Sequence, residues 1–429
     1  MKRLGILLFL TLATILANPL QGEESSGSFY LRGAFYLDWF GTKYQDSPFY
    51  NQLSARFRME LFSRRGTGWT FLLDTRDRFG LSRPGNNQLI LYDARLIFEK
   101  PNSPFFFSVG QMNLYDTAGI GQLLGGILAF KPISDLLLGG YAGLESNIYI
   151  NRLEKDYHKF GLFARYLGKL GKRFSLSYNH IRFSGMTEQQ YIYAGCMYPI
   201  KKYFVFYGNL EYELGSNIQR DDRLSRLFFN MRFDPTSYLD VTAFYSSGRG
   251  LDFHRHLLET SQNPTLNDNK LERYYYSKQF GLRLSVKPLQ GLRLFLSRQE
   301  REQEDDNIRN HSWLFGFSAL NILNTNISAH GNYTSNRGEI SESDSYYISF
   351  SKDFGRISWH GSFSNTFNGL RFAYKNETPQ IIHLSDYKTL STFFFVTISR
   401  NLAASVQYEY LLQEKSNQHL FFVRLIYRK

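Results

Sequence analysis

Apolar residues recur at every second position along most of the chain, from Phe29 to the last segment. In residues 53–61, Leu53, Ala55, Phe57, Met59 and Leu61 alternate with Ser54, Arg56, Arg58 and Glu60. Successive side chains of a β-strand point to opposite faces, so each such segment has one apolar and one polar face. The same alternation recurs in residues 92–99, 159–166, 204–214, 226–233, 280–287, 359–364 and 421–427. The pattern predicts an all-β protein.

The connections between these segments fall into two length classes. Short ones rich in turn residues lie at 64–68, 168–172, 234–237, 288–291, 321–324 and 353–356. Long polar ones are expected at 248–269, 300–310 and 335–344. Alternating lengths predict a meander with tight turns at one end and long loops at the other.

Composition excludes three classes of protein. The 429 residues include 39 Phe, 30 Tyr and 4 Trp, far more apolar surface than a disordered chain carries. After the first 22 residues there is no run of about 18 uncharged apolar residues, which a helical membrane protein requires. Cys196 is the single cysteine, so a disulfide scaffold is impossible.

The amino terminus has the pattern of a cleaved secretory signal. Lys2 and Arg3 precede an apolar stretch from Leu4 to Leu16, and Asn18 and Pro19 make that stretch too short for a membrane anchor. We expect residues 1–22 to be the signal peptide and residues 23–429 to be the mature protein. Removal of Lys2 and Arg3 lowers the formal net charge from +12 to +10.

In its alternation and its two classes of connection, the chain resembles the Gram-negative outer-membrane β-barrel class, and porin-like members in particular. The resemblance is one of pattern, without a specific family motif. It implies a single closed antiparallel transmembrane barrel, an up-and-down meander of about 20 strands with 16 to 22 possible. Only residues 23–28 separate the signal from the first strand, which argues against an amino-terminal plug domain. The chain ends on Arg428 and Lys429, whereas many barrels of this class end on an aromatic residue.

The polar face of the first strands carries regularly alternating acids and bases. A salt-bridge ladder that stiffens the wall is one interpretation, and a charged stripe that biases ion passage is the other. Further on, small neutral groups and histidines replace the charges and favour an aqueous lumen. The candidate pore-lining residues are Arg32, Arg56, Arg58, Asp74, Arg76, Asp93, Arg95, Arg226, Arg232, His330 and His360.

Residues 117–130 are rich in glycine, uncharged and poorly alternating. Buried strands with glycine bends are the simpler interpretation. A segment that folds into the barrel and narrows it is the alternative.

Candidate catalytic and metal sites are weak. Ser328 and His330 share a strand face, as in outer-membrane phospholipases, but they face away from the expected lipid side and no motif accompanies them. The pair His254 and His256 has no third ligand in view. Lys and Arg are scattered singly, which argues against nucleic-acid binding. We expect no enzymatic activity, no cofactor and no bound metal.

The sequence therefore predicts a barrel in the cell outer membrane that forms a water-filled pore for small hydrophilic, possibly anionic, solutes. A surface adhesin or structural barrel that acts through its long loops is the alternative, and an outer-membrane hydrolase or a secreted soluble all-β protein is less favoured. Expected partners are outer-membrane lipid and lipopolysaccharide, the transported solutes and the barrel-assembly machinery. The apolar outer face does not distinguish a monomer from a trimer.

Overall fold

The computed structural model describes residues 29–45, 47–63, 68–81, 88–100, 103–114, 119–147, 152–201, 203–216, 223–249, 276–303, 308–339, 341–372, 380–383, 386–413 and 416–428. The expected signal peptide lies outside these ranges. So do residues 250–269 of the first predicted long loop, including His254 and His256.

The described residues form 23 strands, and every pair of neighbouring strands is antiparallel. Their bounds are β1 (Phe29–Tyr44), β2 (Tyr50–Ser63), β3 (Trp69–Gly80), β4 (Gln88–Glu99), β5 (Phe105–Leu114), β6 (Gly121–Ile133), β7 (Leu136–Asn147), β8 (Arg152–Leu167), β9 (Arg173–Phe183), β10 (Met186–Ile200), β11 (Phe204–Ser216), β12 (Leu224–Phe233), β13 (Leu239–Arg249), β14 (Tyr276–Leu289), β15 (Leu292–Gln303), β16 (Ile308–Ala319), β17 (Ile327–Gly338), β18 (Ser341–Asp353), β19 (Ile357–Phe372), β20 (Gln380–His383), β21 (Tyr387–Thr397), β22 (Leu402–Gln413) and β23 (Ser416–Arg428).

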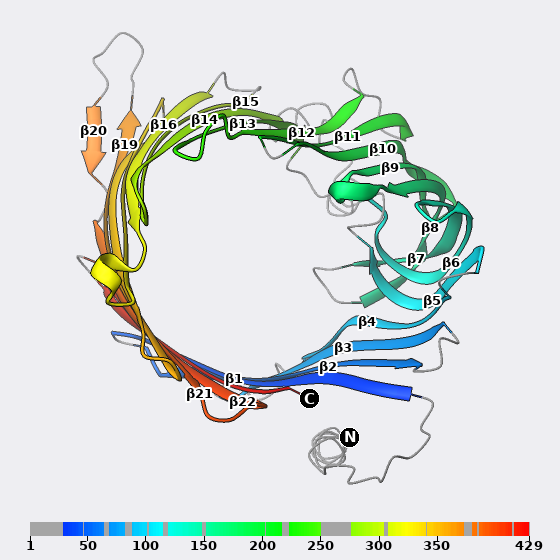
Figure 1. The fold of residues 1–429 in the computed structure, drawn as a ribbon, viewed down its shortest axis with the longest axis horizontal. Coiled ribbons are helices and arrows are strands. Elements are labelled where there is room, and N and C mark those ends of the chain that lie inside the picture. Colours follow the sequence, from blue (N-terminus) through cyan, green and yellow to red (C-terminus); the bar gives the residue numbers. More distant parts are fainter. Residues whose placement is uncertain are drawn as a thin grey trace.

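The sheet closes on itself. β1 pairs with β2 on one side and with β23 on the other, in a register that runs from Ala34 opposite Arg428 to Tyr44 opposite Gln418. The short β20 pairs only with β19, and β19 also pairs with β21. Twenty-two strands therefore form the ring seen in Figure 1. The predicted fold class is confirmed, with a strand number at the upper end of the expected range.

The two faces of the ring have opposite character. Side chains on the convex outer face splay apart and those on the concave inner face converge, so the outer face is the more exposed one. The outer positions carry large exposed apolar side chains, such as Leu89, Leu162 and Phe315 at 67%, 66% and 57% exposure. Inner positions include the buried polar Asp240 and Ser285. The predicted apolar and polar faces thus become the outside and the inside of the barrel.

Both described chain ends lie at one end of the barrel, and so do the predicted short turns at 168–172, 234–237, 288–291, 321–324 and 353–356. At Gly291, one of these turns has φ +82°, and an added Cβ would lie 2.7 Å from the carbonyl oxygen of Leu320. The opposite end carries the longest connections, at 250–275 and 373–386. Among the described residues the helices are two three-residue 3-10 turns, and neither has the length or apolar character of a membrane span.

Two of the predicted long loops are wrong. Most of residues 300–310 belong to β15 and β16, and most of residues 335–344 belong to β17 and β18. Residues of opposite charge lie opposite each other in these strand pairs. Glu302 of β15 lies opposite Arg309 of β16, and Arg337 of β17 lies opposite Glu342 of β18. Charged residues therefore extend the strands beyond the apolar part of the outer face, where they pair rather than form loops.

A row of glycines bends the sheet sharply between β5 and β7. Gly110 pairs with Gly125, and Gly125 pairs with Gly143, so the three lie side by side on the inner face. A Cβ at these positions would lie 2.1–2.3 Å from the backbone oxygens of Ala94, Ala142 and Leu124, respectively. Glycine is therefore required where one strand folds against the next. Residues 121–130 accordingly agree with the strand interpretation, since they belong to the wall strand β6, whereas the carbonyl oxygen of Gly119 accepts a hydrogen bond from Tyr191 of β10.

We expect Gly125→Ala to destabilise the barrel by about 2 kcal/mol, because the new methyl group would collide with the Ala142 carbonyl and force the neighbouring strand to move. Gly126→Ala is the matched control. Its Cβ would point outward, where the nearest atom, Ser108 O, is 3.8 Å away. Urea unfolding of both variants in detergent micelles measures the difference. Equal stability of the two variants would contradict the role assigned to the glycine row.

Candidate functional site: the inner face of the barrel

The first charged cluster lies at the seam where β1 meets β23. Asp38 accepts hydrogen bonds from Arg424 at 2.7 and 3.2 Å and from Arg76 at 3.4 Å, and its side chain is only 5% exposed. Arg76 also donates to Ser54 Oγ at 2.9 Å. One carboxylate thus joins strands β23, β1 and β3 across the closure of the ring.

The other candidates of the first four strands form further ion pairs. Arg56 binds Asp74 in a bidentate pair at 2.8 and 2.7 Å and stacks over Tyr92 at 5.0 Å. Arg58 lies 3.5 Å from Glu60, and Arg95 lies 3.2 Å from Asp93. This arrangement agrees with the salt-bridge ladder, the first of the two interpretations of the charged face.

Arg32 lies opposite Glu60 in the register of β1 and β2. Arg226 lies 3.9 Å from Glu211 and keeps 63% of its side chain exposed. Arg232 donates to Asp234 at 3.0 Å. Arg226 and Arg232 thus keep more than half of their side chains exposed, as Arg58 also does.

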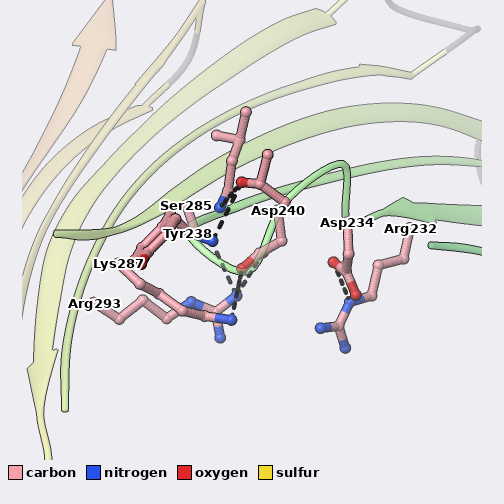
Figure 2. A network of polar contacts seen from close by, with 9 residues as sticks. Arg232, Asp234, Tyr238, Asp240, Ser285, Lys287 and Arg293 are labelled. Atoms are coloured by element: carbon pink, nitrogen blue, oxygen red, sulfur yellow. Dashed lines mark hydrogen bonds and ion pairs between the residues drawn. The ribbon is translucent and has the colours of Figure 1, made fainter. Parts of the chain in front are cut away.

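A second cluster, which we call the basic cluster, consists of Arg283, Lys287, Arg293 and Asp240 on the inner face of β13–β15. Figure 2 shows Lys287 and Arg293 beside Asp240. Arg293 Nη2 donates to both Asp240 oxygens, at 2.6 and 2.8 Å, and to Ser285 Oγ at 3.1 Å. Lys287 Nζ lies 3.9 Å from the same carboxylate. Arg283 packs over the Phe295 ring at 4.1 Å instead of pairing with Asp240. The basic cluster therefore carries more positive than negative charge.

The carboxy-terminal half of the inner face is neutral and hydroxyl-rich. Ser362 and Ser391 share a hydrogen bond of 2.7 Å, and Ser345 and Thr366 share one of 3.0 Å. Of the two candidate histidines, His330 stacks on Phe295 with centroids 5.8 Å apart, and His360 lies opposite Ser351 and Phe393 in register. Ser328 Oγ accepts the backbone N–H of Asn321 at 3.3 Å. Such groups exchange hydrogen bonds readily with water.

An apolar inner patch interrupts the polar lining where the glycine row bends the wall. The patch continues into Tyr141, whose hydroxyl donates to Asn179 Oδ1 at 2.5 Å. Beside it, Lys159 Nζ lies 3.2 Å from Glu145, and its side chain is 3% exposed. The buried members of the patch are Met112, Leu114, Ile120, Leu123, Ile127, Ala129, Leu137, Tyr141 and Phe163. The tight bend therefore encloses a dry core of its own, set into the barrel wall.

The candidate set found by sequence omitted Asp240, Arg283, Lys287 and Arg293. Arg283 and Lys287 stand at polar positions of an alternating segment, so their face was predictable. Their proximity to Asp240 and Arg293 follows from the pairing of β13 with β14 and of β14 with β15. No group of three or more metal-ligand side chains occurs in the part of the chain that the structure describes.

No protein-family model matches the chain, and no curated protein sequence matches it. Among solved structures, it is similar to Pseudomonas aeruginosa OccD3 (OpdP), with 9% identity, coverage of 93% of this chain and 91% of that one, and a TM-score of 0.45. Acinetobacter baumannii OccAB2 has 10% identity, coverage of 94% and 100%, and a TM-score of 0.45. P. aeruginosa OpdL has 10% identity, coverage of 94% and 98%, and a TM-score of 0.44.

Proposed function

We propose that this protein is an outer-membrane channel whose water-filled lumen passes small hydrophilic solutes, with a preference for anions. The observation that carries this proposal is the closed ring of 22 strands with an apolar outside and a polar, charged inside. A bilayer solvates such an outer face, and ring closure leaves no strand edge unpaired. The described secondary structure lies in the wall, at the turns, or in β20 beside β19.

The anion preference is supported by the basic cluster. Two cationic side chains, Lys287 and Arg293, share the Asp240 carboxylate there, and a third, Arg283, contacts an aromatic ring. A charge surplus beside a low-dielectric wall raises the local concentration of counter-ions along that side of the lumen. The ladder between β1 and β4 adds polarity but little net charge, because its acids and bases neutralise each other. We assign the candidates from Arg32 to Arg95 mainly to wall stiffness on this ground.

The proposed function also includes export of the chain through an amino-terminal signal peptide. Residues 1–22 act as a cleaved signal peptide, and residues 23–429 form the mature barrel. Sequencing the amino terminus of the protein in the outer-membrane fraction tests this assignment. An intact Met1 in that fraction would contradict it.

Swelling of proteoliposomes tests the channel itself. We expect vesicles that contain refolded residues 23–429 to swell in isotonic pentose, and faster in a sugar acid than in an amino sugar of similar size. Heat-unfolded protein is the control, because it retains the composition without the closed ring. Vesicles that stay impermeable although they contain folded, inserted protein would contradict the proposal.

A further inference from the structure

A charged pocket opens on the outer face of the barrel, on the upper parts of β13–β16 and away from the end that holds the termini. We call it the outer-rim pocket. Its lining includes Lys278, Phe280, Arg298, Glu300, Glu302 and Arg309, and its volume is about 430 Å³. Below it, the outward residues are apolar and exposed, among them Leu282, Leu296 and Phe315. The pocket therefore begins where the apolar outer face ends.

Trp313 marks this boundary. It is 40% exposed and lies opposite Arg298 in register, and the Arg298 guanidinium stacks on its ring at 5.0 Å. An aromatic side chain at the edge of an apolar belt is typical of the level where hydrocarbon gives way to lipid headgroups. The side chains of the outer-rim pocket thus lie at headgroup height when the barrel spans a bilayer.

The pocket carries a surplus of positive charge with donors still available to a ligand. Its outward-facing lining contains three cationic side chains, those of Lys278, Arg298 and Arg309, and two glutamates, Glu300 and Glu302. Arg298 pairs with Glu300 while 49% of its side chain stays exposed. Arg309 lies 3.3 Å from Glu302 and is 75% exposed. Each of the two guanidiniums donates through Nη2 to a glutamate, which leaves its other N–H groups outside that contact.

We propose that the outer-rim pocket binds the phosphorylated headgroup of an acylated glycolipid in the outer leaflet, with the acyl chains on the apolar face below. Arg guanidiniums bind phosphate oxygens through paired, charge-assisted hydrogen bonds. The continuity of the pocket with exposed apolar side chains favours a lipid over a free anion, since both parts of one molecule are then accommodated. The proposal rests on insertion of the barrel into a membrane and does not depend on an open lumen.

Native mass spectrometry of the refolded protein with diphosphoryl lipid A tests the site. We expect the double variant Arg298→Gln and Arg309→Gln to bind about tenfold more weakly than the unaltered protein. Monophosphoryl lipid A is expected to bind more weakly than the diphosphoryl form, and millimolar inorganic phosphate is expected to leave the bound lipid in place. Single-channel conductance of the same preparations reports the pore separately and is expected to be unchanged.

Arg337→Gln is the matched control. Arg337 faces outward near the same rim and pairs with Asp344 at 2.8 Å, but it does not line the pocket. Heat-modifiable migration in gels verifies that each variant folds. Equal lipid binding by the double variant and the unaltered protein would overturn the proposal, and so would an equal loss in Arg337→Gln. Displacement of the lipid by inorganic phosphate would identify a free-anion site instead and would also overturn it.

Discussion

Asp38→Ala is expected to lower the free energy of unfolding of the barrel by about 3 kcal/mol. The substitution removes the carboxylate that pairs with both Arg76 and Arg424, and it leaves two guanidiniums beside each other at the seam of the ring. Asp38 is nearly buried, so water replaces its hydrogen bonds poorly. Because the seam joins the first strand to the last, loss of the Asp38 carboxylate weakens the closure of the ring.

Urea unfolding in detergent micelles measures this effect, with Asp234→Ala as the control. Asp234 also pairs with an arginine, at 3.0 Å, but both side chains are well exposed, at 30% and 51%. Exposed pairs contribute about 1 kcal/mol or less, so we expect little change. Similar urea midpoints of unfolding for the two variants would contradict the role of the Asp38 carboxylate in stabilising the seam.

The double variant Arg283→Gln and Lys287→Gln is expected to reduce the anion-to-cation permeability ratio by about fivefold. Two unit charges about 16 Å from a passing ion in water contribute about 0.5 kcal/mol, attractive for an anion and repulsive for a cation, and the difference of about 1 kcal/mol corresponds to this factor. Arg293 is left in place, so the bidentate pair with Asp240 is kept and the wall is expected to remain folded. Reversal potentials in a potassium chloride gradient measure the ratio.

Arg337→Gln serves as the control for net charge here as well. It also removes a positive charge, but from the outer surface near the rim rather than from the inner face. An equal change of selectivity in both variants would mean that overall charge, not the basic cluster, sets the preference. Raising the salt concentration should weaken the effect of the basic cluster, since screening shortens the range of its field.

The fold followed from the sequence because period-two alternation constrains every strand in the same way. Each strand had to place one face against lipid and one against the interior, and short turns required adjacent strands to pair. Arg56 and Asp74 were assigned to one face correctly on this reasoning, and the structure brings them together. The two loops predicted at 300–310 and 335–344 are wrong, because high charge density in these segments belongs to strands. In these segments, residues of opposite charge on neighbouring strands form ion pairs.

The basic cluster and the apolar inner patch were not predictable in the same way. Which inward residues meet depends on strand register, and bulges shift it, as between Asp74 and Thr75 or between Glu211 and Tyr212. Alternation also fails between residues 119 and 129, where apolar residues occupy both faces. The bend at the glycine row depends on Gly110, Gly125 and Gly143 lying side by side in neighbouring strands. Because they are far apart in the sequence, this proximity was not predictable without the strand register.

Single-channel recording of refolded residues 23–429 in a planar bilayer under a potassium chloride gradient tests the proposed channel most directly. We predict discrete openings and a reversal potential on the anion-selective side. Absence of conductance from protein verified as folded and inserted would contradict an open lumen, and a cation-selective reversal potential would contradict the role assigned to the basic cluster.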